Sequence, residues 1–68
     1  MMSQEDIAEV EGILAEYFFK KGLGPMDLIG FLGHYLMDIA QAEGISEGYM
    51  DVILYGIKEG YTVRLEED

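Results

Sequence analysis

The stretch IAQAEGISEGYMDVI, residues 39–53, decides the fold, because two helical patterns meet in it at Gly44. The chain before Gly44 is apolar at helical spacing, and a glycine readily adopts the left-handed conformation that often follows a helix. Ser46 is of a residue type that caps the N-terminus of a helix. The stretch therefore predicts that one helix ends at about Glu43 and that the next begins after Ser46.

The same kinds of signal mark the helix boundaries nearer the N-terminus. Pro25 suits the first position of a helix, because its missing N–H would have no partner there. Ser3, with Asp6 three residues later, has the pattern of a capping box, and Gly22 stands where a left-handed cap is expected. We therefore expect a first helix that begins after Ser3 and ends at residues 20–21, and a second that begins at Pro25.

The pattern changes its period near the C-terminus. We expect the third helix to end near Glu59, at Gly60, because residues 61–65 then alternate apolar and polar side chains as a strand does. A single strand has no ladder partner, so this segment is either an extended tail or a strand that pairs with its copy across a dimer axis. The sequence thus predicts an all-α, three-helix single domain over residues 1–68, with a short C-terminal extended or β segment.

Two helical surfaces predict contacts with a second copy of the chain. The second helix is apolar around most of its circumference, which is typical of a central helix or of one at an oligomer interface. The first helix carries a row of small residues, Ala8, Gly12 and Ala15, that would let another helix approach closely. The alternative is that alanine is simply a good helix former and that Gly12 is tolerated. We expect a homodimer, with these three residues as its candidate contact.

The charge of the chain indicates which partners it attracts. Fourteen acidic side chains face four basic ones, for a formal net charge of −10. Such a surface repels phosphate backbones and anionic lipids, and it attracts basic proteins. The simpler alternative is that the acidity only maintains solubility. The sequence lacks a basic segment of the secretory type and a membrane-length apolar run, so we expect a cytoplasmic protein.

Few side chains are available for catalysis or for binding a metal ion. The chain has no cysteine, and its two serines, Ser3 and Ser46, are expected to act as N-caps, so we expect no enzyme. His34 and Asp38 are four residues apart, and their side chains can meet on a helix. They are a weak candidate for half of a metal site, and a solvated pair on the polar face is the favoured alternative. We expect no cofactor.

Residues 39–53 also resemble the turn of a helix-turn-helix. The resemblance depends on an alanine four residues before the turn glycine, Ala40, on the aliphatic Ile45 after it, and on Met50 and Ile53 in the next helix. It implies helix-turn-helix-like packing of the second and third helices, with the third as the reading helix. The start of that helix carries Ser46, Glu47, Gly48 and Asp51. None of these is Arg, Lys, Asn or Gln, the types that most often contact base edges, so we expect the packing without direct binding of nucleic acid.

These features favour a small, acidic, non-catalytic interaction or regulatory protein that binds a protein with a basic face. It would act as an inhibitor, an antitoxin-like mimic of nucleic acid, or an adaptor. The candidate interface residues are Phe19, Phe31, Glu47, Asp51 and Tyr55. One alternative is a carrier that holds a small ligand or a metal in an apolar interior enclosed by a dimer. A second is a degenerate helix-turn-helix regulator, which the charge disfavours.

Overall fold

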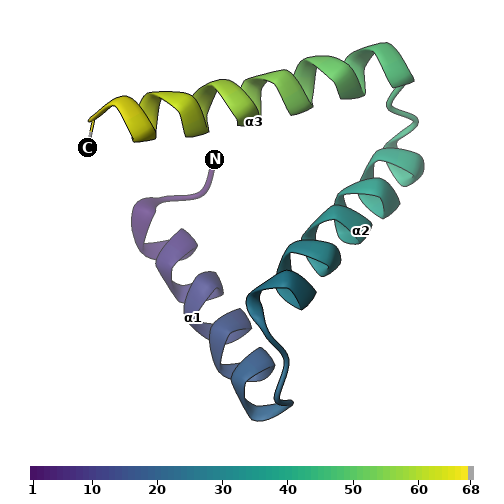
Figure 1. Cartoon of the computed structure of the whole chain (residues 1–68). Helices are drawn as coiled ribbons and strands as arrows, with labels where there is room; N and C mark the ends of the chain where they lie inside the picture. Colours follow the sequence, from purple (N-terminus) through teal and green to yellow (C-terminus); the bar gives the residue numbers. More distant parts are fainter. Residues whose placement is uncertain (68) are drawn as a thin grey trace. The chain divides into compact units, whose positions relative to one another are not determined.

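Three α-helices account for most of the chain in the computed structural model, which describes residues 1–67 (Figure 1). α1 spans Gln4–Lys20, α2 spans Pro25–Glu43 and α3 spans Glu47–Glu67. Residues 1–67 contain no strand. The prediction of an all-α, three-helix chain is therefore confirmed.

The chain divides into two units, Met1–His34 and Tyr35–Asp68, and the division falls within α2. The first unit contains α1 and the first half of α2. The second contains the rest of α2 and α3. That the chain forms one domain over residues 1–68 stays a prediction.

α1 begins with the predicted capping box. The Ser3 hydroxyl accepts a hydrogen bond from the Asp6 amide at 3.1 Å, and the Ser3 amide donates to the Asp6 carboxylate at 3.3 Å. Each bond satisfies a backbone N–H that the helix itself leaves without an acceptor. The position of this N-terminus therefore follows from two side chains three residues apart.

α1 ends in a Schellman motif, the hydrogen-bonding pattern that closes a helix around one left-handed residue. The Leu23 amide donates to the Phe18 carbonyl at 2.9 Å, and the Gly22 amide donates to the Phe19 carbonyl at 3.1 Å. Gly22 is the left-handed residue, with φ of +71°. Glycine accepts this conformation without the steric cost that a Cβ atom brings.

α2 begins two residues after this motif and ends in a second one. At its start the Gly24 amide donates to the Asp27 carboxylate at 2.9 Å, just before the first helical residue, Pro25. At its end the Ile45 amide donates to the Ala40 carbonyl at 2.9 Å. Both boundaries of α2 agree with the sequence-based prediction.

The turn from α2 to α3 has the predicted glycine and serine in the predicted roles. Gly44 is left-handed, with φ of +69°, and the Ser46 hydroxyl accepts from the Tyr49 amide at 3.2 Å. These are local features of one turn. The helix-turn-helix-like packing of α2 and α3 stays a prediction.

The predicted C-terminal strand is wrong, because α3 continues through Gly60 to Glu67. Gly60 has no positive φ and so does not act as a left-handed cap. A strand over residues 61–65 would need another strand to satisfy its backbone groups, whereas a helix satisfies them within itself. The Thr62 hydroxyl donates to the Lys58 carbonyl at 3.1 Å, a bond that a helical side chain makes to the preceding turn. The prediction that α3 ends near Glu59 is wrong for the same reason, and residues 61–65 offer no strand for pairing across a dimer axis.

Only one apolar side chain among residues 1–67 is buried, that of Ala40, which is 6% exposed. The half-buried residues belong to two groups that flank the two turns. In the first unit they are Leu14, Phe18 and Leu28, and in the second they are Leu36, Ile45, Met50 and Ile53. Each group therefore draws its half-buried side chains from the two helical segments that one turn connects. Within residues 1–67 no helix has both the length and the apolar character needed to cross a bilayer.

Candidate interaction surfaces

An aromatic cluster joins α1 to α2 within the first unit. The Phe18 ring lies 5.8 Å from the Tyr17 ring in an edge-to-face arrangement, and 5.9 Å from the Phe31 ring, with the latter two planes tilted by 54°. The Lys21 ammonium lies 5.7 Å from the centre of the Tyr17 ring. Aromatic pairs and cation–π contacts of this kind each contribute about 0.5–1.5 kcal/mol. The cluster therefore helps to hold α1 against α2 within the first unit.

The cluster gives different surroundings to the two phenylalanines predicted at the interface. Phe31 is 39% exposed, and its ring packs at a tilt against the Phe18 ring, so part of this side chain is already in contact within the unit. Phe19 is 84% exposed, although it follows Phe18 directly in α1. Phe19 therefore offers a partner more apolar surface than Phe31 does.

Two of the four basic side chains are engaged near the end of α1. The Lys20 ammonium lies 2.9 Å from the Glu16 carboxylate, one helical turn before it, and both side chains are well exposed. Lys21 lies over the Tyr17 ring. An exposed pair of this type contributes about 0.3–0.5 kcal/mol. Of the two ammonium groups, only that of Lys20 therefore has an opposite charge beside it in these contacts.

The predicted dimer residues Ala8, Gly12 and Ala15 lie on α1 and are exposed. A Cβ atom built at Gly12 would meet no described atom within 4 Å. The row therefore leaves room for a second helix to approach closely. The same space would also accept an alanine at position 12 whose side chain makes no contact. Its role as a dimer contact stays a prediction.

The remaining predicted interface residues share one strip of α3. Glu47, Asp51 and Tyr55 follow each other at intervals of four residues, and residues four apart are neighbours on a helix surface. All three are exposed, and Tyr55 is 66% exposed. The structure thus places two carboxylates and one aromatic ring on a single strip. Phe19 and Phe31 belong to the first unit and are not part of it.

His34 and Asp38 lie one turn apart on α2, as predicted. Residues 1–67 hold no group of three or more His, Cys, Asp and Glu side chains arranged to bind a metal ion. Two ligands on one helix do not fill the coordination shell of zinc, which is almost always four-coordinate in structural sites. The pair stays the weak candidate that the sequence indicated.

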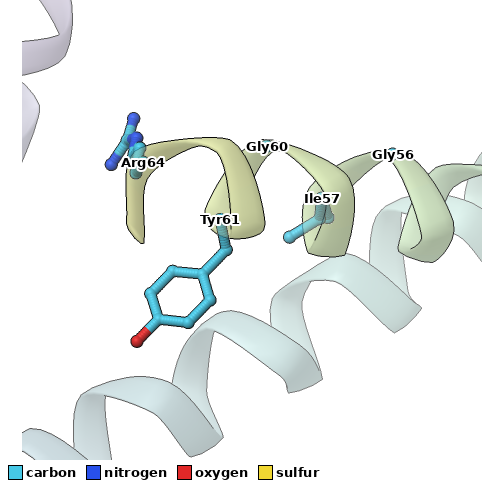
Figure 2. A pocket seen from close by; sticks show the side chains of 5 residues that line it. All are labelled: Gly56, Ile57, Gly60, Tyr61 and Arg64. Carbon is cyan, nitrogen blue, oxygen red and sulfur yellow. The ribbon is translucent and has the colours of Figure 1, made fainter. Parts of the chain in front are cut away.

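Sequence reasoning missed a hollow on α3. It has a volume of about 390 Å³ and is lined by Gly56, Ile57, Gly60, Tyr61 and Arg64. Figure 2 shows the Ile57 and Tyr61 side chains projecting from the same side of the helix. The two glycines are four residues apart and so share one face, and their missing side chains leave space there. The sequence does show the Gly-x-x-x-Gly spacing from which this space could have been predicted. That spacing places both glycines on one helix face only if the helix continues past Gly60.

Comparison of the chain with protein-family models, with curated proteins and with solved structures found no match. The role of these surfaces is therefore inferred from their own side chains.

Proposed function

We propose that this chain is a small, non-catalytic interaction protein that binds a protein with a basic face. The observation that carries the proposal is the exposure of its apolar side chains. Half of the residues are apolar, yet Ala40 alone is buried among the residues that the structure describes. Exposed apolar patches typically mark interaction surfaces, because removing apolar surface from water is a main driving force of protein association.

The charge of the chain supports a basic partner rather than a nucleic acid. The formal net charge is −10. Among the four cations, Lys20 pairs with Glu16 and Lys21 lies over Tyr17. Binding to a phosphate backbone requires cations that replace the counterions of that backbone. A basic protein face instead finds an excess of carboxylates.

The strip on α3 combines the two kinds of contact that such an interface uses. Glu47 and Asp51 would attract the partner and raise the rate of association, which is the main effect of complementary charge. Tyr55, on the same strip, and Phe19 and Phe31 in the first unit would supply desolvated aromatic anchors. If the partner's own ligand is a nucleic acid, the carboxylates would imitate its phosphates. The chain would then be an inhibitor or an antitoxin-like mimic.

The chain is further proposed to act as a cytoplasmic homodimer. The row Ala8, Gly12 and Ala15 is the candidate contact, since it is exposed and leaves room for a second helix. Sedimentation equilibrium at tens of micromolar should give about twice the mass of the 7.7 kDa chain. A clean monomer would remove the dimer from the proposal and leave the basic partner untouched.

Affinity capture followed by a defined binding assay tests the proposed function. The immobilised chain should capture a protein with a basic face, and the purified pair should bind more weakly as salt rises from about 50 to about 500 mM, a range over which the Debye length falls from about 14 to about 4 Å. Duplex DNA should not bind this chain directly. In the mimic version, the partner's nucleic acid should compete with the chain. Affinity that is indifferent to salt would contradict the role of the carboxylates, and a metal or small molecule that copurifies in place of a protein would favour the carrier.

A further inference from the structure

We draw no further inference here: the strongest candidate, the hollow on α3 lined by Gly56, Ile57, Gly60, Tyr61 and Arg64, is an unpartnered helix face with two small residues, and nothing in the structure shows what covers it.

Discussion

The rings of Phe18 and Phe31 lie 5.9 Å apart and join α1 to α2 within the unit Met1–His34. Phe18 is half-buried and is also in contact with the Tyr17 ring. The same residue gives its carbonyl to the Leu23 amide in the turn that follows. One residue of α1 thus takes part both in the aromatic cluster and in the helix cap, so the contact and the turn should depend on each other.

Phe18→Ala should lower the free energy of unfolding by about 2 kcal/mol, because it removes two ring contacts and the half-buried side chain itself. Urea denaturation followed by circular dichroism would measure the change. The matched control is Phe19→Ala at the neighbouring position, which is 84% exposed. It should change the free energy by no more than about 0.5 kcal/mol. Equal losses for the two variants would show that the aromatic cluster does not stabilise the first unit.

Alanine in place of glycine should have opposite effects at Gly44 and at Gly12. Neither new Cβ atom meets a described atom within 4 Å, so the difference between the sites lies in the backbone. Gly44 has φ of +69°, where a Cβ costs about 1–2 kcal/mol. Gly12 lies inside α1, where alanine is favoured over glycine by about 0.5–1 kcal/mol. Urea midpoints should therefore fall for Gly44→Ala and rise for Gly12→Ala, and a rise at both sites would mean that Gly44 is not the left-handed cap.

Gly60→Ala should stabilise the C-terminal half of α3 by up to about 1 kcal/mol, because Gly60 lies inside the helix. Backbone chemical shifts and amide exchange of residues 61–65 would report the change directly. Gly60→Pro is the opposing variant, since proline removes a helical hydrogen bond and clashes with the preceding turn. Alternating, strand-like chemical shifts over residues 61–65 in the unsubstituted chain would contradict the continuous helix.

The success of the sequence-based boundaries and the failure at Gly60 have one physical explanation. The caps at Ser3, Gly22 and Gly44 depend on groups within about five residues, so the local sequence determines them. Gly60 is compatible both with a helix interior and with a left-handed cap. Choosing between these requires knowing whether a partner strand exists for residues 61–65, and that is information outside the segment.

The candidate site was predictable to a similar degree. The spacing of Glu47, Asp51 and Tyr55 is enough to place them on one strip, because a helix fixes the positions of residues four apart. The contact of Phe31 with Phe18 was not predictable from spacing, since it joins two helices across a turn. The hollow at Gly56 and Gly60 was missed because the helix was expected to end there.

Added salt should raise the melting temperature near neutral pH. Fourteen carboxylates against four cations leave net repulsion within the chain, and the Debye length shrinks from about 30 Å at 0.01 M to about 10 Å at 0.1 M. The exposed Lys20–Glu16 pair weakens over the same range, but it contributes only about 0.3–0.5 kcal/mol. Lys20→Gln removes this pair and one positive charge, so its melting temperature should rise more steeply with salt. A melting temperature that falls with salt in the unsubstituted chain would show that ion pairs outweigh the repulsion.

Charge reversal and ring truncation on α3 should slow association and speed dissociation, respectively. Changing Glu47 and Asp51 to Lys alters the net charge by four, from −10 to −6, and should lower the association rate with the basic partner by about tenfold. Tyr55→Ala leaves the net charge unchanged and removes an anchor. Its dissociation rate should rise by about tenfold, since most losses of interface contacts appear in that rate. Surface plasmon resonance at two salt concentrations separates the two effects.

A control with the same net charge decides whether the α3 strip or the whole chain attracts the partner. Glu5 and Glu9 are also four residues apart, but they lie on α1, and changing both to Lys again gives −6. If the partner docks on the strip and the strip's own carboxylates attract it, the α1 variant should keep most of the association rate and its salt dependence, because it leaves Glu47 and Asp51 unchanged. Equal slowing by the two double variants would assign the attraction to the overall charge. Glu47 and Asp51 would then have no separate role in attracting the partner. The strip would contribute to binding only through Tyr55, as an aromatic anchor.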